Sequence, residues 1–217
     1  MSQHLQITEI FHSIQGESTF AGEPCVFVRL TGCNLRCRWC DTEYSFHGGQ
    51  RMSIDDILAK VRAFPCRRVE ITGGEPLLQP AGVKALAERL LAEDFAVMIE
   101  TSGERDLTPV PQAVIKIVDV KCPDSGEGGS FRASNLELLQ PWDELKFVLA
   151  SRDDYDFARG FVDAHRGAHA ARTILFSPVF GQLEAKDLAS WMLADGVPAR
   201  LGLQIHKFIW DPALHGV

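Results

Sequence analysis

Three cysteines with a regular spacing lie in the segment GCNLRCRWCDT. Cys33, Cys37 and Cys40 follow the pattern C-x3-C-x2-C. Thiolates at this spacing can converge from one loop, and such soft ligands select iron–sulfur clusters, copper(I) or zinc over hard cations. A closed zinc site and most [4Fe–4S] clusters need four protein ligands, but no fourth Cys or His stands at a matching spacing. Three thiolates would hold a cluster and leave one iron open to an outside ligand.

Two simpler interpretations of these cysteines stay open. They could be buried thiols, or part of a zinc site that a distant His completes. The remaining cysteines have no metal-ligand spacing: Cys25 opens an apolar segment, Cys66 follows a proline, and Cys122 stands alone. Cysteines of this kind are mostly small buried hydrophobic residues.

The composition is that of an ordinary globular chain. Of the 217 residues, 46% are hydrophobic and 24% are charged, and no linker or repeat is visible, so we expect one domain over residues 1–217. The formal charge of −7 without a basic block argues against nucleic-acid binding and against a membrane-surface partner. No signal peptide or membrane-spanning run is evident. We therefore expect a cytoplasmic protein, in which six cysteines indicate metal binding or catalysis rather than disulfides.

Short β-rich runs alternate with helical patterns along the chain. We expect strands at Cys25–Leu30, Val69–Thr72, Ala96–Glu100, Val114–Val120, Leu145–Leu149, Thr173–Phe176 and Leu201–Ile205. We expect helices at Ile54–Phe64 (capped by Ser53), Ala81–Glu93, Tyr155–His165 and Ala185–Ala194. This alternation indicates an α/β fold with a mostly parallel sheet, and six or seven continuous apolar strands could curl into an incomplete TIM-like barrel.

Polar and glycine-rich motifs follow five of the expected strands. These motifs are TGC, TGGEP, ETSG, DVKCP and SPVFG. Ligands gather at the carboxyl ends of parallel strands. The five motifs therefore predict one large site, where Gly73 and Gly74 would let the backbone approach a ligand closely.

The cysteine motif followed by TGGEP resembles the radical S-adenosylmethionine (SAM) superfamily. The resemblance implies a reduced version of that superfamily's barrel, a [4Fe–4S] cluster on Cys33, Cys37 and Cys40, and SAM chelated to the open iron and cleaved reductively. By position it implies SAM contacts at Gly74, Glu75, Ser102, Asp119, Val120, Lys121, Ser177, Pro178, Val179 and Phe180. From the residues alone, Ser102 could equally be a turn hydroxyl and Lys121 a surface lysine.

Four segments extend the resemblance over nearly the whole chain: EIFHSIQGEST, VFVRLTGCNLRCRWCDT, ITGGEP and LQIHKFIWDP. Together they are similar to the 7-carboxy-7-deazaguanine synthase family. The resemblance implies a carbon–nitrogen lyase that ring-contracts 6-carboxy-5,6,7,8-tetrahydropterin to 7-carboxy-7-deazaguanine with release of ammonia, in queuosine and 7-deazapurine biosynthesis. It also implies a homodimer, Mg²⁺, and a flavodoxin-like or ferredoxin-like electron donor. Some relatives insert a long loop between the first two cluster cysteines. The short loop in this chain implies that the surface on which the electron donor docks differs from that of those relatives.

Arg29 is a lone charge in an otherwise apolar strand, which suits a carboxylate clamp. It could alternatively be a strand-edge arginine that faces solvent. Gln15 and Glu17 offer polar groups suited to the amide and amino edge of a pterin. By position, the family's substrate contacts match Ile14, Gln15, Gly16, Thr72 and, where the C-terminal carboxylate reaches the substrate, Val217.

Thr42 follows Cys40 by two residues and matches the family's Mg²⁺ ligand. A single protein ligand suffices for Mg²⁺ because the ion keeps waters and takes substrate oxygens. Thr42 could instead cap the segment that follows it. His206 and Lys207 are expected to end the last strand, and no residue is assigned as catalytic.

Two other functions compete with the synthase. A glycyl-radical-enzyme activase is also a small radical SAM protein, but it acts on a protein backbone and does not need Arg29 or Mg²⁺. A non-catalytic iron–sulfur or zinc protein would use the three cysteines as a scaffold or sensor.

Overall fold

The computed structural model describes residues 4–212 and 214–217, so the expected domain of 1–217 is seen without residues 1–3 and 213. Its strands form one sheet in the order β3-β1-β2-β4-β5-β6-β7-β8-β9. The strands are β1 (His4–Ile14), β2 (Pro24–Leu30), β3 (Gln50–Ser53), β4 (Arg68–Gly73), β5 (Ala96–Thr101), β6 (Ile115–Asp119), β7 (Glu144–Leu149), β8 (Thr173–Pro178) and β9 (Arg200–Leu201). From β2 to β9 all neighbours are parallel, which confirms the mostly parallel α/β fold.

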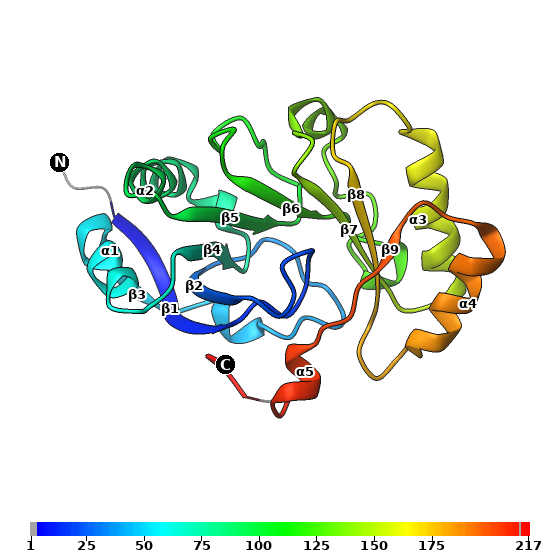
Figure 1. The fold of residues 1–217 in the computed structure, drawn as a ribbon, viewed down its shortest axis with the longest axis horizontal. Helices are drawn as coiled ribbons and strands as arrows, with labels where there is room; N and C mark the ends of the chain where they lie inside the picture. Colours follow the sequence, from blue (N-terminus) through cyan, green and yellow to red (C-terminus); the bar gives the residue numbers. More distant parts are fainter. Residues whose placement is uncertain (1–3, 213) are drawn as a thin grey trace.

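The helices cover one side of the curved sheet (Figure 1). They are α1 (Ile54–Arg62), α2 (Pro80–Ala92), α3 (Arg152–Ala164) and α4 (Ala185–Asp195), whereas the short α5 (His206–Ile209) lies on the opposite, inner side. Ser53 caps α1, as predicted, because its Oγ accepts a hydrogen bond from the Asp56 N–H at 3.1 Å. Ser151 caps α3 in the same way through the Asp154 N–H at 3.3 Å. The sheet stays open between β3 and β9, so the barrel is incomplete.

Each central strand presents two different faces. One face carries residues such as Val28, Ile71 and Ile99, which belong to the main apolar core against the helices. The other face points into the partial barrel, where Phe27 and Met98 join a second, smaller apolar cluster. Because successive strand residues alternate between faces, the polar residues of the inner face are held away from the helices and toward the barrel interior.

Two N-terminal strands are absent from the sequence-based expectations. β1 pairs antiparallel with both β2 and β3, so it places the start of the chain inside the sheet. The expected strand over 201–205 is wrong in its extent: β9 pairs with β8 only through Arg200 and Leu201. The chain then leaves the sheet, because the Ile205 N–H bonds to the Gly16 carbonyl at 2.8 Å, and His206 begins α5 instead of ending a strand.

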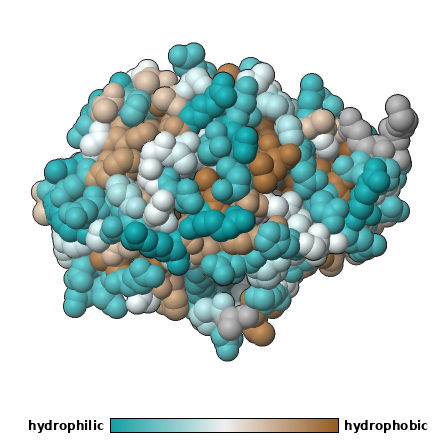
Figure 2. Space-filling model, turned by 180° about the vertical axis from the view of Figure 1, so that it is seen from behind, coloured by the Kyte–Doolittle hydropathy of each residue, from teal (hydrophilic) through white to brown (hydrophobic). Residues whose placement is uncertain are grey.

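Hydrophilic residues cover most of the face seen from behind, and its hydrophobic residues form separate patches (Figure 2). Within the described residues, no helix is both long enough and apolar enough to cross a membrane.

Candidate active site

A cavity of about 320 Å³ lies inside the partial barrel, at the carboxyl ends of its strands. This volume is in the range of small-molecule sites. Residues from all five predicted motifs line it, namely Cys33, Gly74, Ser102, Lys121 and Phe180. The expectation that these motifs meet at one rim is confirmed. The segment from Gln204 to Val217 contributes further wall residues, so the chain that leaves β9 returns across the cavity.

All three motif cysteines line this cavity from the loop after β2. None forms a disulfide, and burial raises the pKa of the Cys33 thiol and raises that of Cys37 to about 11. Among the described residues, no group of three or more His, Cys, Asp or Glu side chains is arranged to hold a single metal ion. Three thiols from one loop that face a common cavity fit an iron–sulfur cluster. Each thiolate binds a different iron atom of such a cluster, so the three sulfur atoms are farther apart than the ligands of a single ion.

The other cysteines lie outside the cavity wall. Cys25 and Cys122 are fully buried, as expected for small apolar side chains, and Cys66 is half-buried in the connection before β4. Burial raises the pKa values of the Cys25 and Cys122 thiols, which keeps both neutral.

The glycine pair brings the end of β4 against the cysteine loop. A Cβ on Gly74 would stand 2.2 Å from the Gly32 carbonyl oxygen and 2.7 Å from the Cβ of Cys33. The next residue, Glu75, donates its backbone N–H to that same carbonyl at 2.8 Å. The lack of a side chain at Gly74 is therefore needed for the loop that carries Cys33 to close over the strand end.

Glu75 joins two of the motif loops from below the cavity. One carboxylate oxygen accepts hydrogen bonds from the Thr101 hydroxyl at 2.8 Å and the Leu77 N–H at 2.9 Å. The other accepts the Ser102 N–H at 2.9 Å and the Ser102 hydroxyl at 2.7 Å. The Ser102 hydroxyl also accepts the Glu104 N–H at 3.4 Å, so it serves in the turn as well as at the cavity wall. This buried carboxylate is thereby fully hydrogen-bonded.

The predicted SAM contacts divide into two groups by position. Gly74, Ser102, Asp119, Lys121, Val179 and Phe180 line the cavity. The side chains of Glu75, Val120, Ser177 and Pro178 are buried and are not part of its wall, with Val120 in the core on the helix side. The role of each of these residues toward SAM stays a prediction.

Lys121 is a cavity residue and not a surface lysine. Its Nζ lies 2.7 Å from the Asp119 carboxylate. Burial alone would lower the pKa of Lys121, but the negative charge of Asp119 and its hydrogen bond to the ammonium group raise it, so the side chain stays cationic. The second carboxylate oxygen of Asp119 is buried without a hydrogen-bond partner among the described residues. The loop after β6 thus presents a cation and a free acceptor beside the cysteines.

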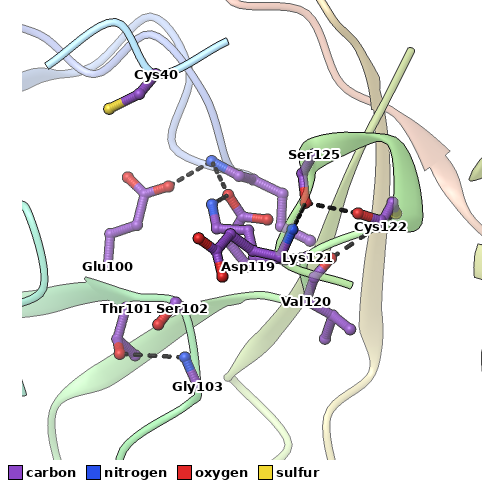
Figure 3. A network of polar contacts seen from close by, with 12 residues as sticks. Cys40, Glu100, Thr101, Ser102, Gly103, Asp119, Val120, Lys121, Cys122 and Ser125 are labelled. Carbon is purple, nitrogen blue, oxygen red and sulfur yellow. Dashed lines mark hydrogen bonds and ion pairs between the residues drawn. The ribbon is translucent and has the colours of Figure 1, made fainter. Parts of the chain in front are cut away.

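Lys146 on β7 is the centre of a buried charge cluster. Its ammonium group lies 2.5 Å from Glu17 and 3.8 Å from Asp119, and it also forms an ion pair with Glu100. Figure 3 shows Glu100, Asp119 and Lys121 in one network of polar contacts. Burial would raise the pKa of Glu17, but Lys146 and His206 hold it at about 2. Burial would lower the pKa of Lys146, which the surrounding carboxylates instead raise well above its usual value.

Arg29 points into the barrel from β2, between β1 and β4, so it is not a strand-edge residue facing solvent. Its side chain is only 14% exposed, and its Nε donates to the Glu9 carboxylate at 2.8 Å. Glu9 also accepts the Tyr44 hydroxyl at 2.7 Å. One Nη of Arg29 reaches the Gly73 carbonyl at 3.4 Å. The guanidinium is therefore fixed at the cavity wall beside the glycine pair, where it can meet an anionic ligand.

The predicted substrate segment follows β1, and Ile14, Gln15, Gly16 and Glu17 all line the cavity. The amide of Gln15 is already engaged: it donates to Glu70 at 2.9 Å and accepts the Glu17 N–H at 2.5 Å. A Cβ on Gly16 would stand 2.0 Å from the His206 ring, so that ring packs directly on the glycine. Burial lowers the pKa of His206, which favours the neutral imidazole.

Thr42, Thr72 and Val217 also line the cavity. The Thr42 side chain makes no capping hydrogen bond to the short helical turn that follows it, so the capping interpretation of this residue is wrong. Its hydroxyl lies 3.7 Å from the Cys40 sulfur. Near Val217, His215 stacks on Tyr44 with ring centroids 3.9 Å apart, which holds the C-terminal segment against the cavity.

Sequence reasoning missed four charged residues of this site: Glu9, Glu70, Glu100 and Lys146. Glu70, Glu100 and Lys146 line the cavity. Each is a charged residue inside a mostly apolar strand, in RVEITG, AVMIET and ELKFVL. A charged residue within an apolar strand is the pattern that identified Arg29, so the same pattern could have identified these three residues.

The fold and the cysteine loop define a radical SAM protein. Residues 27–123 match the family described as the Radical SAM superfamily. The structure is similar to the crystal structure of QueE from Escherichia coli, with a TM-score of 0.78, 24% identity, and 92% and 93% of the two chains covered. It is also similar to Streptococcus suis SuiB bound to S-adenosylmethionine, with a TM-score of 0.54 and 13% identity over 80% of this chain and 44% of the other. At these identities the likeness shows the fold.

Comparison with curated relatives identifies the family within the radical SAM superfamily. The chain is 54% identical to the 7-carboxy-7-deazaguanine synthase of Koribacter versatilis, over 98% of this chain and 100% of the relative. It is 47% identical to the synthase of Chlorobaculum tepidum, over 98% and 97% of the two chains. The chain therefore belongs to the 7-carboxy-7-deazaguanine synthase family.

Proposed function

We propose that this protein is a radical SAM carbon–nitrogen lyase that converts 6-carboxy-5,6,7,8-tetrahydropterin to 7-carboxy-7-deazaguanine and ammonia, in 7-deazapurine and queuosine biosynthesis. The observation that carries the proposal is the position of Arg29, which lies largely out of solvent, with its side chain 14% exposed, at the wall of the cavity that the three cysteines line. Relatives of that name match nearly the whole chain at 54% and 47% identity. A carboxylated small molecule is the ligand class that such an arginine recognises.

Cys33, Cys37 and Cys40 would hold the [4Fe–4S] cluster, and SAM would complete the coordination of its open iron. When bound, the cluster and SAM supply the one-electron chemistry that starts the reaction by removing a hydrogen atom from the substrate. Ser102 and Lys121 would contact SAM from the loops after β5 and β6, a role that their place in the cavity wall supports.

The pterin would enter with its carboxylate toward Arg29. The Glu17 carboxylate, whose pKa Lys146 holds at about 2 against the effect of burial, accepts hydrogen bonds from Lys146 and Gln204, and its remaining lone pairs would accept from the amide and amino edge of the ring. Thr72 follows Glu70 on β4 and pairs in register with Arg29, so its hydroxyl faces the same part of the cavity. Ile14 and Gly16 also line the cavity and would contact the substrate.

Thr42 is the proposed protein ligand of Mg²⁺. Its hydroxyl is at the cavity wall and is not used to cap a helix. Waters and oxygens of the substrate carboxylate would complete the octahedral shell that Mg²⁺ requires. The ion would then pair with the carboxylate and stabilise the negative charge that develops during the rearrangement.

Family membership also supports a homodimer that works in the cytoplasm with a flavodoxin-like or ferredoxin-like electron donor. The cysteine loop carries Arg36 and Arg38, two exposed cations that are not part of the cavity wall. Acidic electron carriers would be attracted to this surface.

An anaerobic assay tests the proposal. Protein reconstituted with iron and sulfide is incubated with SAM, dithionite, Mg²⁺ and the carboxylated tetrahydropterin, and the product is followed by mass. We expect 7-carboxy-7-deazaguanine and one ammonia per turnover. Cleavage of SAM without pterin conversion would favour an activase, and colourless protein with stoichiometric zinc would favour a scaffold; either result would overturn the proposal.

A further inference from the structure

Glu70 lies on the inner face of β4, deep in the cavity. In the parallel register of β2 and β4, Phe27 pairs with Glu70 and Arg29 pairs with Thr72. Residues two apart on a strand are separated by about 6.6 Å and neighbouring strands by about 4.8 Å. Glu70 is therefore the next inward-facing residue below Thr72, one strand away from the proposed carboxylate clamp.

The carboxyl group of Glu70 has few partners for a buried acid. It is 1% exposed, and its only hydrogen bond within the described part of the chain comes from the Gln15 amide at 2.9 Å. The ammonium group of Lys146 is directed to Glu17, Glu100 and Asp119, and the described residues provide no ion pair to Glu70. A buried carboxylate without a cation is costly, so this position favours the neutral acid, whose O–H is a donor.

The neighbouring carboxylates also favour the neutral acid at Glu70. The groups that face Glu70 are Glu17 from the loop after β1, Cys25 from β2, Glu100 from β5 and Lys146 from β7. Burial, followed by the negative charge of Glu100, raises the pKa of Glu70 to about 8, against the opposing effects of the Gln15 hydrogen bond and of Lys146. A group with this pKa is protonated at neutral pH and can still give up its proton.

The proposed reaction needs a proton donor close to Arg29. In the substrate, the carbon that bears the carboxylate is bonded to a ring nitrogen. In the product, that carbon is bonded directly to the pyrimidine ring, and the nitrogen has left as ammonia. The leaving nitrogen therefore adjoins the carbon whose carboxylate Arg29 would hold, which brings it to the part of the cavity between Arg29 and Glu70.

We infer that Glu70 is a catalytic residue that protonates the leaving nitrogen, an inference that rests on the proposed function. As the carbon–nitrogen bond breaks, its electron pair stays on nitrogen and the Glu70 proton moves to that nitrogen, so that neutral ammonia leaves. The adjacent ring carbon then loses a proton, which the Glu70 carboxylate takes up. The step is redox-neutral and restores the acid.

Glu70→Gln tests the inference, because glutamine keeps the size and the acceptor for Gln15 but cannot donate an acidic proton. Under single-turnover conditions we expect ammonia release to slow by about 100- to 10,000-fold. Substrate-dependent SAM cleavage should persist, and a rearranged species heavier than the product by one ammonia should accumulate. The wild-type rate should fall as the pH rises through about 8, the pKa of Glu70, and the variant should lose this limb.

Glu144→Gln is the matched control. Glu144 is an equally buried strand glutamate whose carboxylate accepts hydrogen bonds from Thr19, and it is not part of the cavity wall. This variant should release ammonia at the wild-type rate. Should Glu70→Gln fail to load iron, Glu70→Asp takes its place and should retain the pH limb at a reduced rate.

Two outcomes would count against these ideas and are distinguishable. Ammonia release by Glu70→Gln at the wild-type rate, with the same pH profile, overturns the role of Glu70 alone. Failure of the wild-type protein to consume the pterin overturns the proposed function, and the role of Glu70 falls with it.

Discussion

The Glu75 carboxylate accepts two hydrogen bonds from Ser102, one from its backbone N–H at 2.9 Å and one from its hydroxyl at 2.7 Å. This contact ties the loop after β4 to the loop after β5. Because the Glu75 N–H also bonds the Gly32 carbonyl, the cysteine loop belongs to the same rigid unit. The three loops that are proposed to surround SAM are thus held together by one buried carboxylate beneath the cavity.

Replacing Glu75 with Gln should disturb both folding and SAM binding. An amide NH₂ would face donors that now bond a carboxylate, and hydrogen bonds to charged groups contribute about 1.5–3 kcal/mol each. We expect the free energy of unfolding to fall by about 2–3 kcal/mol in urea titrations, and SAM affinity of the cluster-loaded protein to weaken. Glu88→Gln, on the exposed face of α2, is the control. Equal stability of both variants would contradict a joining role for Glu75.

Each of the substitutions Cys33→Ala, Cys37→Ala and Cys40→Ala should abolish SAM cleavage. A three-ligand cluster has no spare thiolate, so the loss of one prevents stable assembly. Iron content and the absorbance of the brown chromophore measure this separately from activity. Cys66→Ala removes a half-buried thiol outside the cavity and should keep full iron loading. A normally loaded Cys37→Ala protein would show that the ligand set is different.

Arg29→Ala should impair pterin conversion while leaving uncoupled SAM cleavage nearly unchanged. Truncating one partner of a buried charge pair costs about 2–5 kcal/mol, so we expect kcat/KM for the pterin to fall by about 100-fold or more. Uncoupled SAM cleavage should change little, because Arg29 is not a cluster ligand. Arg62→Ala, which removes an exposed ion pair with Glu93 on the outer surface, is the control. Normal pterin turnover by Arg29→Ala would refute the carboxylate clamp.

Thr42→Val should raise the Mg²⁺ concentration needed for half-maximal turnover by about 10-fold or more, because the side chain keeps its shape and loses its oxygen. Thr42→Ser retains the hydroxyl and should respond to Mg²⁺ like the wild-type protein. The measurement is the initial rate of product formation over a Mg²⁺ titration. Identical titration curves for the Val and Ser variants would remove Thr42 from the metal site.

The stability of the protein should depend on pH through Glu70. Its folded-state pKa of about 8 is above its ordinary value of 4.5, so the folded protein binds this proton more tightly than the unfolded chain. The resulting stabilisation is complete below pH 4.5 and is lost as the pH rises to about 8. Glu17 acts in the opposite sense, since its stabilisation is present above pH 4.5 and is lost as the pH falls toward 2.

Urea unfolding of the wild-type protein and of Glu70→Gln between pH 5 and 8 measures this effect. The free energy of unfolding of the wild-type protein should decline with pH relative to that of the variant. Glu17 contributes nothing to the difference in this window because it stays ionised in both states. Parallel curves would show that Glu70 titrates normally in the folded protein.

The strands and helices that could be predicted are those with a clear hydrophobic pattern. The parallel strands from β2 to β8 and the four longer helices appear where apolar runs and caps such as Ser53 placed them. The strand expected up to Ile205 was wrong, since the bond between the Ile205 N–H and the Gly16 carbonyl draws the chain out of the sheet. β1 was missed because it carries polar residues among its apolar ones, and its pairing with both β2 and β3 is a long-range property.

The sequence by itself determined the cysteine loop, the glycine turn and the convergence of five motifs, because each depends on residues close together in the chain or on the general geometry of parallel strands. Only the tertiary structure decided that Lys146 meets Glu17 and Glu100, which are 129 and 46 residues away, and that Glu70 lies in the cavity without an ion pair to any described residue. The physical reason is that the spacing of residues within one loop is enough to specify which metal ligands that loop can present. The register and curvature of the sheet specify which distant charges share the low-dielectric interior, and so which of them are ionised.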